Sequence, residues 1–230
     1  MDELAVSYKS GDQDLTITAE DVRTYICPDA TVKEIKLFLE LCAAKHMNPY
    51  LRDAHLIKYG NNPATMVTGK DYFVRTARAN ADFDGFKAGL VLMDQQGNIH
   101  KPEGSNPLPG MSIIGGWAMV FTKTCSHEFY EEVSFNEYAG TRYDRESGQQ
   151  VLNTQWAKMP GTMIRKVALV HALREAFPSD FGGLYDSCEM GVEVDEKPVI
   201  KHTVISDGYQ DEGYFIEDDP VIENEILEKF

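Results

Sequence analysis

The chain has 230 residues, of which 43% are hydrophobic and 10% aromatic, enough to bury a core in one domain with extensions or in two small domains. Its 22 Lys and Arg against 37 Asp and Glu give a formal charge of −15, which taken alone argues against a nucleic-acid partner. The sequence has neither an apolar run of membrane-spanning length nor a signal-peptide pattern, and its four cysteines lack metal-ligand spacing. We therefore expect a cytoplasmic protein with reduced thiols and no membrane partner.

The first part of the chain predicts two helices. Residues 1–15 are weakly patterned and fit an irregular or strand-like lead. A short helix is predicted over 18–25, with Thr18 as its N-cap. A second helix starts after Thr31, because Thr31 and Glu34 have the spacing of a capping box. The apolar stripe that follows has a helical period and consists of Val32, Ile35, Phe38, Leu39, Leu41 and Cys42.

Beyond residue 50, the patterns change from a hairpin to a helix and then to a sheet. The predicted elements are a hairpin (55–59 and 64–68), a helix (70–81), antiparallel strands (83–93, 112–121 and 127–134) and a long helix (160–177). Pro160 is favoured in the first turn of a helix, and Pro178 closes this one. The order of elements favours the α+β class, with an antiparallel hairpin and meander sheet packed on a long central helix.

A basic, acid-free segment interrupts this acidic chain. From Ser147 to Arg174 there is no carboxylate, and the segment includes Lys158, Arg165 and Lys166. On a helical wheel, Lys166 and Arg174 fall inside the apolar arc of the long helix, where an unpaired charge is costly. Two interpretations stay open: these cations pair with carboxylates from other segments, or the helix lines a groove in which they meet the phosphates of a ligand.

The acidity is concentrated at the C-terminal end of the sequence. Residues 191–230 hold 12 acidic and 3 basic residues, a net charge of −9 out of the −15 of the whole chain. Two prolines and little helical periodicity accompany this composition. We therefore divide the chain into a folded domain over 1–190 and an acidic, flexible tail over 191–230. A tail of this kind, tethered near a basic groove, is expected to compete with an anionic ligand for the same cations.

Motifs of nucleotide-dependent and hydrolytic enzymes are absent from the sequence. The stretch from Gly60 to Lys70 superficially resembles a P-loop, but its glycine spacing does not fit one, and neither GxGxxG nor GxSxG occurs. A weak Asp-x-Asp pair leaves one alternative open, a metal-dependent nuclease that uses Asp71, Asp82 and Asp84. Otherwise the sequence predicts no catalytic residue, no metal site and no ATP cofactor.

Four blocks in a fixed order carry a family resemblance. Two of them read LFLELCAAKHMNPYLRDAHLIKY and VTGKDYFVRTARANADFDG. A looser sheet block holds Trp117 and Phe135, and the last block combines a Trp with PGTMIRKVALVHALREAFPSDFGGLYDSCEM. Over about Thr31 to Met190 the chain resembles the phage single-strand annealing proteins of the RecT and lambda Red beta group, and it is most similar to the Red beta branch.

The resemblance implies ATP-independent binding of single-stranded DNA and annealing of complementary strands in phage homologous recombination. The annealing-protein core, residues 1–190, is expected to be oligomeric and to form rings or helical filaments. The resemblance implies no enzyme activity and no cofactor, with magnesium assisting only through the DNA. The implied partners are single-stranded DNA and the annealed duplex, further copies of the chain, a phage 5′→3′ exonuclease and a host single-strand binding protein.

The resemblance also implies a set of DNA-binding residues. The implied cations are Lys58, Lys70, Arg75, Arg165, Lys166 and Arg174, to which less well-matched regions add Lys123 and Arg142. Trp156 is a candidate surface on which a base stacks, although an aromatic residue is more often part of a core.

The sequence departs from the family pattern at two places. Gly161 and Thr162 stand where the lambda protein has basic residues on this helix, and the acidic tail stands where that protein carries a helical C-terminal domain. Docking of an exonuclease through such a domain therefore does not transfer to this chain. A non-catalytic recombination adaptor that acts through its acidic tail is a second alternative, which an absence of DNA binding would favour.

Overall fold

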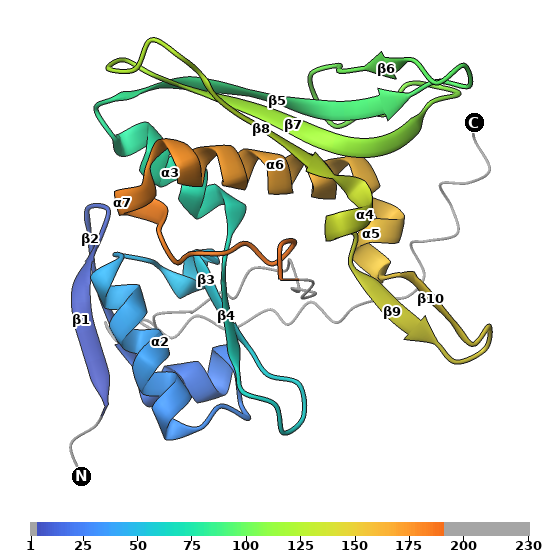
Figure 1. The fold of residues 1–230 in the computed structure, drawn as a ribbon. Coiled ribbons are helices and arrows are strands. Elements are labelled where there is room, and N and C mark those ends of the chain that lie inside the picture. Colours follow the sequence, from blue (N-terminus) through green and yellow to red (C-terminus); the bar gives the residue numbers. More distant parts are fainter. Residues whose placement is uncertain (1–3, 191–230) are drawn as a thin grey trace, which may run out of the picture. The chain divides into compact units, whose positions relative to one another are not determined.

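The computed structural model describes residues 4–190, and the largest sheet there has four antiparallel strands (Figure 1). The strands lie in the order β6-β5-β7-β8, with bounds Ile99–His100, Phe83–Met93, Ser112–Thr122 and Phe129–Ser134. The three predicted strands are confirmed to within two residues at their ends. The short strand β6 is not predicted, since two residues carry no periodic pattern. The predicted acidic tail lies outside the described residues.

Helix α6 (Pro160–Ala176) packs against strands β5, β7 and β8 of this sheet (Figure 1). The predicted helix is confirmed, with Pro160 in its first turn. Close approach to β7 is possible because Gly116 has no side chain: a Cβ there would lie 2.6 Å from the carbonyl oxygen of Ile164. The core residues that the helix contributes are Met163, Ile164, Val167, Ala168, Leu169, Val170, Ala172 and Leu173. This burial fixes which side of α6 stays available to other segments.

A hairpin and two capped helices open the described chain. These are β1 (Ala5–Ser10), β2 (Gln13–Thr18), α1 (Ala19–Asp21), its π-helical continuation (Val22–Ile26) and α2 (Val32–Ala44). The hairpin falls in a stretch whose sequence is weakly patterned. Both predicted N-caps are confirmed: Thr18 and Thr31 each accept a hydrogen bond from the N–H of the acidic residue three positions on. The predicted stripe of α2 is correct except at Val32, which lies in the first turn and is 60% exposed.

A second hairpin and a helix follow, as predicted. These are a 3₁₀ turn (Pro49–Leu51), β3 (Ala54–Ile57), β4 (Thr65–Thr68) and α3 (Lys70–Ala79). Each predicted element is one or two residues longer than the observed one. Because β4 leads into α3 through Gly69 alone, the first turn of this helix is fixed next to the end of the hairpin.

Several short elements of the second half are not predicted. They are α4 (Phe135–Tyr138), β9 (Thr141–Asp144), β10 (Gln149–Leu152), α5 (Thr154–Lys158) and α7 (Pro178–Phe181). Strands β9 and β10 pair as a hairpin around Gly148, whose φ of 68° suits glycine. The described residues thus form an α+β structure of small antiparallel sheets and several helices. None of the helices described in residues 4–190 has the length and apolar character needed to cross a bilayer.

Candidate nucleic-acid interface

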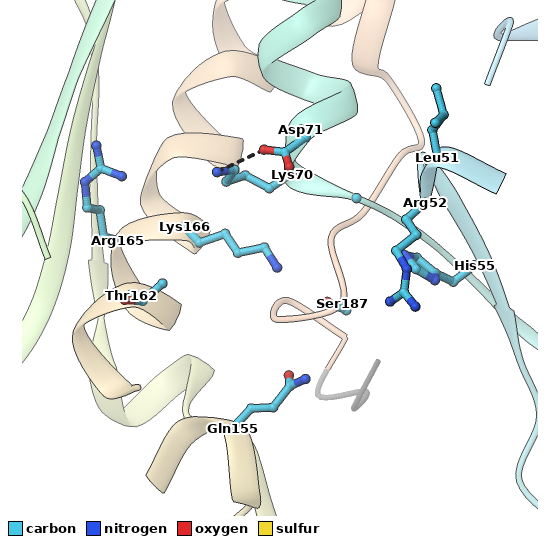
Figure 2. A pocket seen from close by; sticks show the side chains of 11 residues that line it. Leu51, Arg52, His55, Lys70, Asp71, Gln155, Thr162, Arg165, Lys166 and Ser187 are labelled. Atoms are coloured by element: carbon cyan, nitrogen blue, oxygen red, sulfur yellow. Dashed lines mark ion pairs between the residues drawn. The ribbon is translucent and has the colours of Figure 1, made fainter. Parts of the chain in front are cut away.

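A cavity of about 350 Å³ lies where segments far apart in the sequence converge. The turn before β3, the first turn of α3, α5 with the first half of α6, and the chain after α7 all contribute to its walls (Figure 2). The charged and titratable residues of the lining are Arg52, His55, Lys70, Asp71, Arg165 and Lys166. Four of these six are cations and one is a carboxylate, in a chain whose overall charge is −15.

The position of Arg52 is set by the turn between α2 and β3. Asn48 caps this turn by accepting a hydrogen bond from the N–H of Tyr50, and its own N–H donates to the buried carboxylate of Asp53 at 2.8 Å. At the end of the turn Arg52 adopts the left-handed conformation, with a φ of 65°. Its Nε and Nη1 atoms are buried and have no hydrogen-bond partner among the described residues.

The first turn of α3 forms a second wall of the cavity. Gly69 is its N-cap, and a Cβ at this position would collide with the carbonyl oxygen of Arg52, so glycine lets the two segments meet. The N–H of Gly69 donates to the carbonyl oxygen of Asp53 at 2.9 Å, which ties the helix start to the turn. Lys70 follows and pairs with Asp71 at 3.0 Å.

Lys166 reaches the cavity from α6, on the side opposite Arg52 (Figure 2). Its ammonium group lies 3.3 Å from the carboxylate of Asp186, which is fully buried. Burial opposes the charge of Lys166, but the carboxylate of Asp186 outweighs it, and the pKa of Lys166 is raised. Its neighbour Arg165 also lines the cavity, but its Nε donates to the carbonyl oxygen of Ala88 at 3.0 Å, which directs it towards the sheet.

The pKa of His55 reflects its burial and the positive charges that surround it in this cavity. Burial and, to a smaller extent, the positive charges of Arg52 and Lys166 lower the pKa of its imidazole to about 4, against the opposing effect of Asp186. The ring is therefore neutral at pH 7. Thr162 and Ser187 add hydroxyl groups to the lining. A half-enclosed cavity lined by cations and hydrogen-bond donors has the chemistry of a site for an anion.

The predicted DNA-binding residues separate into two groups in the structure. Lys70, Arg165 and Lys166, which come from segments about 100 residues apart in the chain, meet in the cavity. The others do not line it. The environment of each of these cations decides whether its charge is available to a ligand.

Three of the predicted cations outside the cavity pair with carboxylates. Lys58 lies 2.9 Å from Glu34, and its side chain is only 10% exposed. Arg75 lies 2.6 Å from the buried carboxylate of Asp53, although 52% of its side chain is exposed. Arg174 lies 2.6 Å from Glu189.

Two further predicted cations lie on the surface. The ammonium group of Lys123 donates to the carbonyl oxygen of Ala81 at 2.7 Å. Arg142 is exposed on β9.

Lys166 and Arg174 show the first of the two arrangements that the helical wheel allows, because carboxylates from another segment meet them. These carboxylates belong to Asp186 and Glu189 in the chain after α7. The segment from Ser147 to Arg174 contains no carboxylate itself, but carboxylates from another segment lie next to it in the structure. For Lys166 the pairing leaves the ammonium group at the wall of the cavity.

The prediction that a base stacks on Trp156 is wrong for this structure. The side chain is 1% exposed and packs edge-to-face on Phe135, with ring centroids 5.4 Å apart. The backbone N–H of Trp156 donates to the side-chain oxygen of Asn153, which caps α5. Trp156 is therefore a core residue that anchors α5 below the cavity wall.

Arg52 is the one cation in the lining of the cavity that is not among the predicted DNA-binding residues. It sits in the quoted block LFLELCAAKHMNPYLRDAHLIKY, next to the Asn-Pro turn signal, and no periodic pattern marks it. A cation directly after a short capped turn was the available signal. The glycine that lets the turn of Arg52 approach α3, Gly69, lies in another segment.

The arrangement of the carboxylates gives no support to the nuclease alternative. Asp71 pairs with Lys70, and the carboxylate of Asp82 accepts hydrogen bonds from the backbone and the hydroxyl of Thr124. Within residues 4–190, no three His, Cys, Asp or Glu side chains come together in a way that could hold a metal ion.

Comparison with known proteins gives one family. The sequence model of the family described as the RecT family matches residues 12–201 of this chain. These residues include every segment that lines the cavity. No curated protein matches the chain at a significant level.

Proposed function

Because the chain belongs to the RecT family, whose members anneal DNA strands in recombination, we propose that it binds single-stranded DNA and anneals it to a complementary strand. The observation that carries this proposal is the cavity between Arg52 and Lys166. Four cations line this one cavity, although the chain as a whole is acidic. DNA is the polyanion that the family match indicates, and phosphates are the groups that such a lining binds best.

The annealing itself needs no nucleotide hydrolysis in this proposal. Base pairing supplies the free energy, and the protein lowers the repulsion between two strands by neutralising phosphates and holding the bases accessible. The absence of a P-loop motif from the sequence is in line with this mechanism. We propose that no cofactor is required and that magnesium acts only on the DNA.

Self-association belongs to the same proposal. We propose that residues 1–190 form the annealing and oligomerisation domain and that copies assemble into rings or helical filaments. Strand β8 supports this view, because it ends the four-stranded sheet and its outer edge pairs with no other strand among residues 4–190. Such an edge can pair with another chain. The exonuclease and the single-strand binding protein remain proposed partners, and the acidic tail is a proposed docking segment for a basic partner.

We expect the purified protein to anneal two complementary oligonucleotides, added one after the other, at equal rates with and without ATP. Quenching between dyes on the two strands measures the rate, and gel electrophoresis of the same samples shows whether the strands stay intact. The control is the spontaneous annealing rate of the two oligonucleotides without protein.

Three results would contradict the proposal in different ways. A strict requirement for ATP would remove the mechanism, since the sequence offers no loop for the nucleotide. Magnesium-dependent shortening of the strands would favour a nuclease. Failure to bind either strand would favour the adaptor that acts through its acidic tail.

A further inference from the structure

The seven residues that follow the turn after α7 connect two parts of the molecule. We call residues 184–190 the closing segment, which has neither a helix nor a strand of its own. An isolated parallel β-bridge joins Asp186 to Thr68 at the end of β4, and the N–H of Thr68 donates to the carbonyl oxygen of Tyr185 at 2.8 Å. Side chains of α6 hold its other side. The closing segment therefore links α6 with the hairpin that leads into α3 (Figure 1).

The carboxylate of Glu189 makes the largest number of these contacts with α6, and its side chain is only 4% exposed. Its Oε1 atom lies 2.6 Å from Nη2 of Arg174 and 2.8 Å from Nε2 of His171. Its Oε2 atom accepts from Nη1 of Arg174 at 3.2 Å and from the backbone N–H of Asp186 at 2.8 Å. Burial opposes the charge of Glu189, but the hydrogen bonds from His171 and Arg174 outweigh it, and the pKa of Glu189 is lowered.

The guanidinium group of Arg174 serves the closing segment and not the cavity. Besides its pairing with Glu189, its Nη1 donates to the carbonyl oxygen of Leu184 at 3.0 Å. The group also lies over the ring of Tyr185, 5.0 Å from the ring centroid. The family resemblance marks Arg174 as a DNA-binding cation, but the geometry assigns it to the contacts that hold the closing segment on α6.

Glu189 acts on the cavity through Asp186, although it does not line the cavity itself. The N–H of Asp186 donates to the carboxylate of Glu189, and the N–H of Glu189 donates to the carbonyl oxygen of Asp186 at 3.1 Å. These bonds fix the backbone of the residue whose buried carboxylate lies 3.3 Å from the ammonium group of Lys166. Both Lys166 and Ser187, which follows Asp186, lie in the lining (Figure 2).

We propose that Glu189 is a positioning residue for DNA binding. With Arg174 and His171 it fixes the closing segment on α6. Through Asp186 it then holds the ammonium group of Lys166 at the wall of the cavity. The inference deepens the proposed function and rests on it for the role of the cavity, whereas the position of Lys166 can be measured without DNA.

The variant Glu189→Gln tests this proposal through the sign of its effect on DNA binding. Glutamine has nearly the same shape but one acceptor oxygen, so in either orientation its amide group faces two of the four donors. We expect Glu189→Gln to bind oligothymidine about tenfold more weakly than the parent, within the range for coupling through a network of side chains. Direct contact of Arg174 with DNA predicts the opposite, because the variant frees its guanidinium group and removes a negative charge. Binding equal to or tighter than that of the parent would refute the proposal, and annealing by the parent would leave the proposed function standing.

Two controls separate positioning from charge and from stability. Glu175 is an exposed carboxylate on the same helix, so Glu175→Gln changes the net charge equally and should bind at least as tightly as the parent. Thr31→Ala removes the N-cap of α2 and lowers stability far from the closing segment in the sequence. It should keep the parental affinity at a temperature where circular dichroism shows it to be folded.

Acetylation of Lys166 by an N-hydroxysuccinimide ester gives a readout that needs no DNA. Mass spectrometry compares its rate with that of Lys36, whose side chain is 61% exposed on α2. We expect the ratio of the two rates to rise about threefold or more in Glu189→Gln, as for the loss of one link in a coupled network. The ratio should stay parental in Glu175→Gln and Thr31→Ala. If it rises while the parent binds no DNA, the positioning of Lys166 stands and the proposed function fails.

The double variant Arg174→Met, Glu189→Met covers the case in which Glu189→Gln does not fold. It removes both charges of the pair, so neither is left buried without its partner. The hydrogen bond from the N–H of Asp186 to Glu189 is still lost, and we expect the same rise in the acetylation ratio of Lys166. A parental ratio in Glu189→Gln, or in the folded double variant, would overturn the proposal.

Discussion

Replacing Lys166 with methionine is expected to lower the free energy of unfolding by about 3–5 kcal/mol, the cost of leaving a buried charge without its partner. The carboxylate of Asp186 is fully buried, and the ammonium group of Lys166 lies 3.3 Å from it. The second carboxylate oxygen of Asp186, Oδ2, already has no hydrogen-bond partner among residues 4–190. Urea denaturation followed by circular dichroism measures the change.

The double variant Lys166→Met, Asp186→Asn is the control for this prediction. Asparagine can still accept the hydrogen bond that Asp186 receives from the N–H of Cys188, but it carries no charge to be stranded. We expect the double variant to recover at least half of the lost stability. A Lys166→Met variant as stable as the parent would show that the pair contributes nothing to stability.

The pairing also decides how the role of Lys166 in DNA binding is measured. A single substitution changes the fold and the cavity together, so weak binding by Lys166→Met has two explanations. The comparison of the double variant with Asp186→Asn alone, both at temperatures where each is folded, isolates the contribution of the ammonium group to DNA affinity.

Replacing Trp156 with alanine is expected to cost about 3–5 kcal/mol of stability, the range for removing a large aromatic side chain from a core. Its ring is 1% exposed and packs on Phe135, so the substitution leaves a hole beneath α5. We expect the salt dependence of DNA binding by the folded fraction to stay that of the parent, because Trp156 contributes no charge to the cavity.

Tyr143→Ala is the matched control for Trp156→Ala. Tyr143 lies on β9 and is 61% exposed, so its removal should leave the midpoint of urea denaturation nearly unchanged. A Trp156→Ala variant with parental stability and weak DNA binding would contradict the structure and restore base stacking as the role of this residue.

Local signals in the sequence account for the parts of the fold that were predicted correctly. The capping box of Thr31 and Glu34 marks the start of α2 within the chain itself, and Pro160 does the same for α6. The strand at 83–93 has the observed bounds of β5. These signals involve neighbouring residues, so no knowledge of distant contacts is needed to use them.

The hairpin of β9 and β10 is not predicted, because its sequence carries no comparable local signal. Its strands have four residues each and are largely exposed, so they show no alternation of apolar and polar residues. The only turn signal in this stretch of the sequence is Gly148, and neither side of it has a pattern that is recognisable as a strand.

The candidate site could be predicted only in part, because it is assembled from distant segments. Arg165 and Lys166 stand out in the acid-free segment of the sequence, and the family resemblance adds Lys70. Arg52 becomes prominent only when Gly69 and Lys166 are placed around it. The pairing of Lys166 with Asp186 joins residues 20 positions apart, and the helical wheel indicated that such a partner was needed without indicating which one.

We propose that this acidic chain holds single-stranded DNA at the cavity between Arg52 and Lys166. Photo-crosslinking of the full chain to a single strand that contains 5-iododeoxyuridine, followed by mass spectrometry of the peptides, tests it most directly. We expect crosslinks to the turn over residues 48–55 and to the first half of α6, and we expect them to be lost when inorganic phosphate is added in excess. Crosslinks confined to the hairpin of β9 and β10 or to that of β1 and β2, with none at the cavity, would contradict it.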